Sequence, residues 1–202
     1  MTQVDWFNIL LALTGIPSLV LIILISVRDK SLSRAYFGLA ILSFLAGIGL
    51  GYIKAIPTEL SIEWGNLLAI TFTLCGLFVI IRNSKPVFAR FPLYMTTLPL
   101  LVVFFYPIIN DAEVVKELLM IIYEGGALIV SFLVFGINQF VFKNRALLLL
   151  GVLIFLSSYI SFWFIKESMI QFHEEISISL FSFGILVLSI GFKRISEKES
   201  KQ

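Results

Sequence analysis

Apolar runs of about 20 residues recur along the whole of this chain, and each is long enough for an α-helix to cross the hydrocarbon core of a bilayer. The composition agrees, because 59% of the residues are hydrophobic, only 14% are charged and the mean hydropathy is +1.01. The runs leave no room for a soluble domain. We therefore expect a single all-α transmembrane domain over residues 1–202, embedded in a lipid bilayer.

The hydropathy pattern predicts seven transmembrane helices. The first apolar run follows MTQVDW, which lacks the basic residues of a signal peptide, and leads into a basic loop rather than a small-residue cleavage site. We therefore expect this run to remain as the first helix. The seven spans are expected near residues 7–27, 36–56, 65–82, 91–109, 115–138, 146–165 and 173–192.

Basic residues concentrate on one side of the predicted membrane. Of the 15 Lys and Arg residues, 12 fall in the loops after the first, third and fifth helices and in the tail, leaving Lys54, Lys116 and Lys166 opposite. The positive-inside rule then predicts an outside N-terminus and a cytoplasmic C-terminus. Most acidic residues, Glu63 among them, fall on the outer side and are interpreted as solvated charges. Short loops favour a bacterial-type inner membrane protein.

The spacing of the helices indicates an internal repeat. Pairs such as Gly15 and Gly125, or Glu63 and Glu175, match at shifts of 110 to 112 residues. We expect a three-helix unit over 7–82, a linking helix over 91–109 and a second three-helix unit over 115–192. This 3+1+3 layout resembles that of SWEET-type sugar carriers and PnuC-type vitamin carriers, which implies parallel halves; no residue motif is shared.

The linking helix is rich in proline. Pro99 falls inside the predicted span, where a proline removes one backbone donor and clashes with the preceding turn. We therefore expect a kink in the fourth helix.

A carboxylate lies in the middle of the fifth predicted helix. Glu124 belongs to a line of polar residues spaced by seven, which places them on one helix face: Asn110, Glu117, Glu124, Ser131 and Asn138. A charged side chain at the bilayer centre costs roughly 3 kcal/mol or more, and such residues usually serve ion or substrate pathways. Because burial disfavours the charged form of a carboxyl group, we expect Glu124 to bind a proton or a cation in at least one working state.

Other polar side chains are predicted to share the bundle interior with this line. They are Thr14 in the first helix, Asn66 and Thr73 in the third, and Ser157 and Ser161 in the sixth. The competing interpretation is that small hydroxyl residues simply let helices pack closely. His173, the only histidine, is interpreted as an interfacial, pH-sensitive contact.

The sequence holds no pattern that predicts catalysis. With one histidine and one cysteine it predicts no metal site, and we find no nucleophile motif or phosphate loop. The last predicted helix, 173–192, contains no lysine that could hold retinal, so no cofactor is expected. A net charge of +2 without an extended basic face argues against nucleic acid.

Two functions stay open. The first is a small transporter or channel for a small solute, coupled to a proton or cation through Glu124, with the solute near the midplane as in carriers built from repeats. The second is a non-catalytic sensor or accessory subunit that acts through a partner membrane protein. Homo-oligomerisation is compatible with either.

Overall fold

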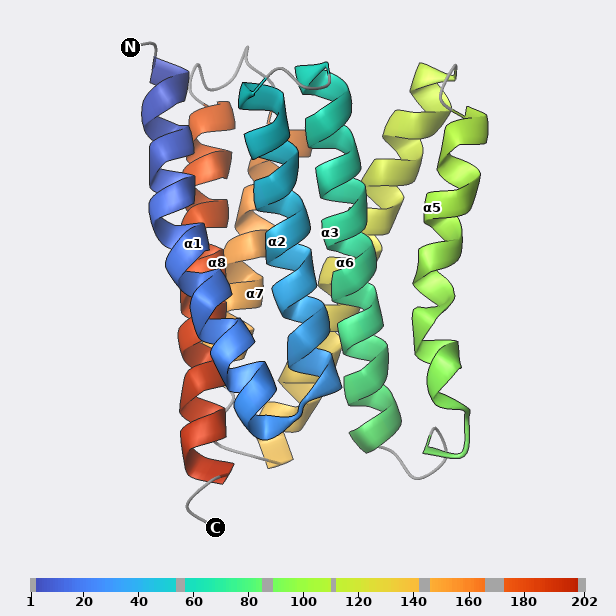
Figure 1. Cartoon of the computed structure of the whole chain (residues 1–202), viewed down its shortest axis with the longest axis vertical. Coiled ribbons are helices and arrows are strands. Elements are labelled where there is room, and N and C mark those ends of the chain that lie inside the picture. The colour runs from blue at the N-terminus through green and yellow to red at the C-terminus, as the bar shows by residue number, and fades with distance from the viewer. Residues whose placement is uncertain are drawn as a thin grey trace. The chain divides into compact units, whose positions relative to one another are not determined.

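The computed structural model describes residues 3–53, 57–84, 89–109, 112–141, 146–165 and 173–199. These residues form helices and turns and contain no strand. In chain order (Figure 1), the elements are α1 (Gln3–Asp29), α2 (Leu32–Tyr52), α3 (Thr58–Ser84), η1 (Leu93–Leu100), α5 (Leu101–Phe105), η2 (Tyr106–Ile109), α6 (Glu113–Val141), α7 (Ala146–Trp163) and α8 (His173–Glu199).

Six of these helices are long and apolar enough to cross a membrane, judged by length and composition over the described residues. Their candidate spans are Ile9–Asp29, Leu32–Gly51, Thr58–Ser84, Glu113–Gly136, Ala146–Trp163 and Glu175–Glu197. The chain is therefore a multi-pass helical membrane protein. The predicted all-α class and the order of seven helical segments are confirmed, whereas the repeat and the orientation of the termini remain predictions.

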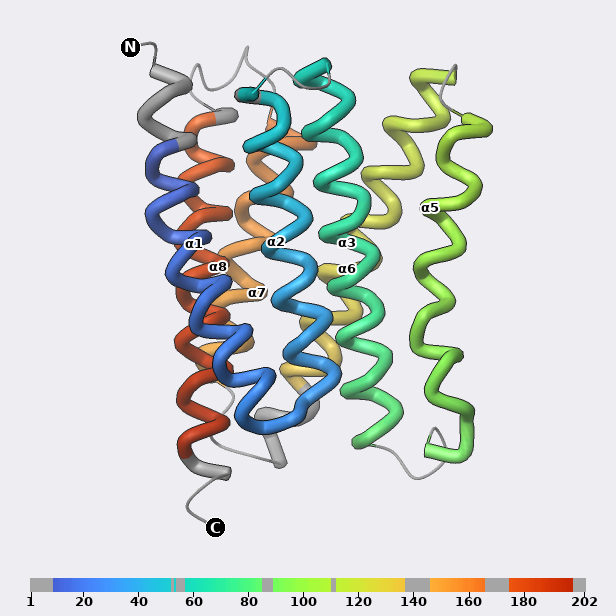
Figure 2. The backbone as a smooth tube through the Cα atoms, viewed as in Figure 1, coloured from blue at the N-terminus to red at the C-terminus, as the bar shows by residue number. Residues whose placement is uncertain are grey.

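The fourth segment differs from the continuous helix that the sequence predicted over 91–109. It consists of the 3-10 helix η1, the five-residue α5 and the 3-10 turn η2, and at 17 residues, Leu93–Ile109, it is shorter than the six candidate spans (Figure 2). Pro99 lies inside η1, so the expected kink takes the form of 3-10 winding. Eight residues is long for a 3-10 helix, whose hydrogen-bond geometry is poorer than that of an α-helix.

The second and third helices begin several residues earlier than the sequence predicted. The structure begins α2 at Leu32 and α3 at Thr58, against predicted starts at 36 and 65. Pro57 stands immediately before α3, and its carbonyl accepts the Ser61 backbone N–H at 3.0 Å. A proline suits this position because the first turn of a helix does not need its missing donor.

The chain divides into two compact units, residues 1–25 with 131–202, and residues 26–130. The boundaries fall inside α1 and inside α6, so the units do not coincide with the predicted segments 7–82, 91–109 and 115–192. That predicted division was inferred from helix spacing and remains a prediction.

Within unit 26–130, a tight corner joins the end of α1 to α2. Lys30 adopts φ 48°, and the Ser31 N–H bonds back to the Ser26 carbonyl at 3.1 Å, the pattern of a Schellman cap. Arg34, only 7% exposed, pairs with Asp29 across the corner. The corner thus satisfies the last carbonyls of α1 and compensates a buried guanidinium.

The α2–α3 hairpin of the same unit packs through glycines. A Cβ built on Gly47 would lie 2.8 Å from the Cα of Gly65, so the two backbones touch. The hydroxyl of Ser61 donates to the Gly47 carbonyl at 2.6 Å at the same crossing. Small residues let transmembrane helices approach this closely, and interhelical hydrogen bonds hold them there.

In unit 1–25 with 131–202, α7 and α8 form a second hairpin. Ser158 and Ser177 bond reciprocally, because each hydroxyl donates to the carbonyl of the other at 2.8 to 3.0 Å. A Cβ on Gly151 would meet Leu188 at 3.0 Å, and one on Gly191 would meet Leu148 at 2.8 Å. Serine and glycine therefore act in this hairpin as the packing interpretation expected.

Candidate functional site

A polar cluster of unit 26–130 centres on Glu63, in the second turn of α3. Its carboxylate receives the Lys116 ammonium of α6 at 2.7 Å to one oxygen and 2.9 Å to the other. The Tyr106 hydroxyl of η2 donates to the same carboxylate. Both charged side chains are mostly buried, with exposures of 19% for Glu63 and 23% for Lys116. We call Glu63, Tyr106 and Lys116 the Glu63 cluster.

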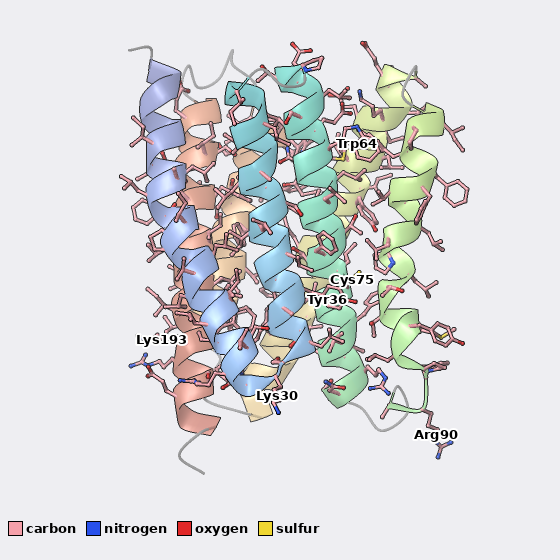
Figure 3. All side chains as sticks on the ribbon, in the orientation of Figure 1. Lys30, Tyr36, Trp64, Cys75, Arg90 and Lys193 are labelled. Atoms are coloured by element: carbon pink, nitrogen blue, oxygen red, sulfur yellow. The ribbon has the colours of Figure 1, made fainter. Side chains whose placement is uncertain are left out.

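The aromatic ring of Tyr106 supports the Glu63 cluster from the side. It is 1% exposed and packs edge-to-face against Trp64, with ring centroids 5.4 Å apart. Trp64 lies toward one end of α3 and Cys75 further along the same helix (Figure 3). The cluster therefore ties together α3, η2 and the first turn of α6, three elements from separate parts of the chain.

Sequence reasoning missed the Glu63 cluster. It assigned Glu63 and Lys116 to the outer side of the membrane, and it interpreted Glu63 as a solvated charge. The structure starts α3 seven residues earlier than the predicted start at 65, and Glu63 thereby falls inside a candidate span. An acid within an apolar span was the available signal, and it depended on the helix boundary.

A second polar contact lies at the interruption of the fourth segment. The hydroxyl of Tyr123, which precedes Glu124 on α6, donates to the carbonyl of Pro99 at 2.8 Å. Tyr123 also interacts with the side chain of Thr71 on α3, and the Tyr36 hydroxyl of α2 interacts with Thr96 of η1. Polar side chains of α2 and α6 therefore meet η1.

The threonines at this level satisfy their own hydroxyls. Thr71, fully buried, donates to the Leu67 carbonyl at 2.7 Å, and Thr96, 4% exposed, donates to the Leu93 carbonyl at 2.7 Å. Their oxygens keep acceptor capacity while the donated protons are engaged.

The two predicted acids of α6 differ in burial. Glu124 is half-buried, whereas Glu117, one heptad earlier, is exposed. Glu124 is therefore the acid of this pair that is partly withdrawn from the surface, and its role in a pathway stays a prediction.

Asn66 and Thr73, the predicted site residues of α3, differ in hydrogen bonding. The Thr73 hydroxyl donates to the Ala69 carbonyl at 2.8 Å. The Asn66 amide oxygen, Oδ1, is buried and has no hydrogen-bond partner within the part of the chain that the structure describes. It is the one buried side-chain polar atom there that lacks a partner.

The remaining predicted site residues belong to the other unit. Thr14 is 8% exposed and donates to the carbonyls of Leu10 and Leu11, Ser131 and Ser161 are buried, and Ser157 is exposed and donates to Leu153 of its own helix. The side chains of Asn138 and His173 lie outside the described residues.

Among the described residues, no three His, Cys, Asp or Glu side chains gather where they could hold a metal ion. Unit 26–130 instead offers a carboxylate paired with an ammonium, a tyrosine bonded to an interrupted helix, a half-buried glutamate and an unpaired amide oxygen. Such groups can bind protons and hydrogen-bonding solutes. Comparison with known proteins found no matching family model, no similar curated protein and no similar solved structure.

Proposed function

We propose that this protein is a small membrane transporter that moves a small solute and couples it to a proton or a small cation through Glu124. One observation carries the proposal: the residue beside Glu124, Tyr123, hydrogen-bonds at 2.8 Å to the Pro99 carbonyl of the interrupted helix η1. The acid and the helix interruption are thereby adjacent. Carriers commonly bind substrate where a transmembrane helix is interrupted.

The interruption supports a binding role on physical grounds. Irregular backbone at membrane depth is tolerated where it is buried in protein or lines a water-filled cavity, because lipid offers no hydrogen-bond partners. Thr96 and Pro99 are buried, while Tyr94 and Leu98 of the same helix are exposed. η1 therefore has one face directed into its unit, and this face carries the Pro99 carbonyl.

The coupling follows from the position of Glu124. Proton or cation binding changes the charge in this part of α6, and a change of charge in a low-dielectric setting has a large effect on free energy. A change in the position of α6 would reach η1 through Tyr123. The same proposal includes the remaining predicted pathway residues, which are Glu117, Thr14, Thr73, Ser131, Asn138, Ser157 and Ser161.

The finer topology forms part of this proposal. We infer an outside N-terminus, a cytoplasmic C-terminus and a 3+1+3 repeat in a bacterial-type inner membrane. The charge bias of 12 basic residues against three supports the orientation.

The test is proton flux into proteoliposomes that contain a trapped pH-sensitive dye, driven by a potassium diffusion potential. A small solute is added outside, because a coupled carrier moves protons together with its solute. We expect the wild type to acidify the lumen above empty vesicles, and the Glu124→Gln protein to lose at least about tenfold of that flux, since the amide cannot carry a proton. The Glu113→Gln protein is the matched control, because this acid is exposed on the same helix and is not one of the predicted pathway residues. Equal proton flux in wild-type and empty vesicles, with the solute present, would overturn proton coupling through Glu124.

The accessory-subunit alternative is decided by the same preparation. Purification in mild detergent of a stoichiometric second membrane protein, together with wild-type flux equal to that of empty vesicles, would favour it over transport.

A further inference from the structure

The buried amide oxygen of Asn66 has no hydrogen-bond partner among the residues that the structure describes, and its own helix cannot supply one. Hydroxyl side chains in a helix donate to a carbonyl of the preceding turn, as Thr71 and Thr73 do at 2.7 and 2.8 Å. A carbonyl oxygen can only accept, and the N–H groups in a helix interior are already engaged in the helix. An acceptor on α3 must therefore find its donor elsewhere.

Asn66 lies at membrane depth rather than in a solvated end. It follows the start of α3 at Thr58 by eight residues, which corresponds to roughly 12 Å along the helix axis. Buried side-chain oxygens in folded proteins almost always have a partner, so one without a partner requires an explanation such as a bound molecule.

The charge around Asn66 limits what that molecule can be. The nearest charged residue on α3 is Glu63, three residues earlier and hence a neighbour on the helix surface. The Glu63 carboxylate is already compensated by Lys116 at 2.7 Å. A cation here would meet one neutral amide oxygen in a setting where an uncompensated charge is costly, whereas an O–H or N–H group would meet the acceptor it needs.

We propose that Asn66 is a solute-binding residue of the transporter, and that the solute is neutral and donates an O–H or N–H hydrogen bond to its Oδ1 atom. This inference rests on the proposed transport function and adds the chemical class of the substrate.

The first test is the thermal unfolding midpoint of purified protein without added solute. An acceptor without a partner costs stability, so Asn66→Leu, which removes it at similar volume, is expected to raise the midpoint by about 2–4 °C. A structural Asn that bonds within the protein would give a fall instead, and a fall overturns the inference. Thr73→Val, which removes a satisfied hydroxyl from the same face, is the control and is expected not to raise the midpoint.

The second test is solute entry into proteoliposomes, followed by stopped-flow light scattering with glycerol, glucose and urea as neutral donors and choline chloride as the charged control. We expect the wild-type protein to raise the entry rate of at least one neutral solute but not that of choline. In the Asn66→Leu protein, this entry rate should be lower by about tenfold. Asn66→Ser keeps a polar side chain, and its hydroxyl can donate to a carbonyl of its own helix. We expect it to lose as much of the solute entry rate as Asn66→Leu does.

The outcomes separate the two proposals. If wild type carries a neutral solute and Asn66→Leu carries it equally fast, the role of Asn66 is overturned while transport stands. If wild type carries only choline, the neutral substrate class is overturned while transport stands. If wild type carries nothing and shows no proton flux, both proposals are overturned.

Discussion

Tyr123 of α6 donates its hydroxyl hydrogen to the main-chain carbonyl of Pro99 at 2.8 Å, which joins the helix that carries Glu124 to the interrupted fourth segment. Removing this hydroxyl with Tyr123→Phe should lower the free energy of unfolding by about 1 kcal/mol, because the ring stays and only the bond is lost. If this hydrogen bond transmits movement between α6 and η1, the proton flux of the Tyr123→Phe protein should fall by more than the loss of folded protein explains. Thermal unfolding and proteoliposome flux, measured on one preparation, check this; unchanged flux would separate Tyr123 from coupling.

The ion pair of the Glu63 cluster should show a measurable coupling energy. Lys116→Met leaves the Glu63 carboxylate with Tyr106 alone and should destabilise the protein by about 1–2 kcal/mol, since a largely buried charge loses its partner. The double variant, Glu63→Gln with Lys116→Met, should lower the free energy of unfolding by less than the sum of the two single changes. A double-mutant cycle in thermal or denaturant unfolding measures the difference, and additive effects would show that the contact contributes nothing.

The glycine crossing of the α2–α3 hairpin should reject even one methyl group. In Gly65→Ala the new Cβ would lie 2.8 Å from the Cα of Gly47, so the helices must separate, at an expected cost of about 1–3 kcal/mol. Gly49→Ala is the matched control on α2, since a Cβ there meets nothing within 4 Å. It should be neutral or stabilising by up to about 1 kcal/mol, because alanine favours helix. Equal effects at both positions in thermal unfolding would contradict the close crossing.

The corner after α1 should accept glycine with a gain in stability. Lys30 holds φ 48°, a left-handed conformation that costs a residue with a Cβ roughly 1–2 kcal/mol. Lys30→Gly should therefore stabilise by about 0.5–1 kcal/mol, after allowing for the greater freedom of glycine in the unfolded chain. Lys30→Ala, which removes the charge and keeps the Cβ, separates the backbone effect from electrostatics. A gain with alanine equal to that with glycine would assign the effect to charge.

The orientation can be read from cysteine labelling. Cys75 is fully buried and is the only cysteine, so Cys75→Ser provides a background for single exposed probes. With an outside N-terminus, Glu59→Cys should react with an impermeant maleimide on intact cells, and Arg90→Cys only after permeabilisation. The reverse pattern would invert the topology.

The sequence by itself determined the helical, membrane-spanning character of this protein. Lipid offers the backbone no hydrogen bonds, so each apolar run of about 20 residues has to satisfy its own main chain as a helix. Hydropathy is a local property, and it placed all seven helical segments in order. It also indicated Pro99 as the place where the fourth segment is irregular.

Tertiary structure decided which side chains meet. Glu63 and Lys116 are 53 residues apart, and Tyr123 and Pro99 are 24 apart, so no periodicity links them. Their contacts depend on how each helix is rotated about its axis and on where it begins, and the start of α3 at Thr58 is what brings Glu63 into a span. Only packing shows that Thr73 is satisfied by its own helix, while the Asn66 oxygen finds no partner among the described residues.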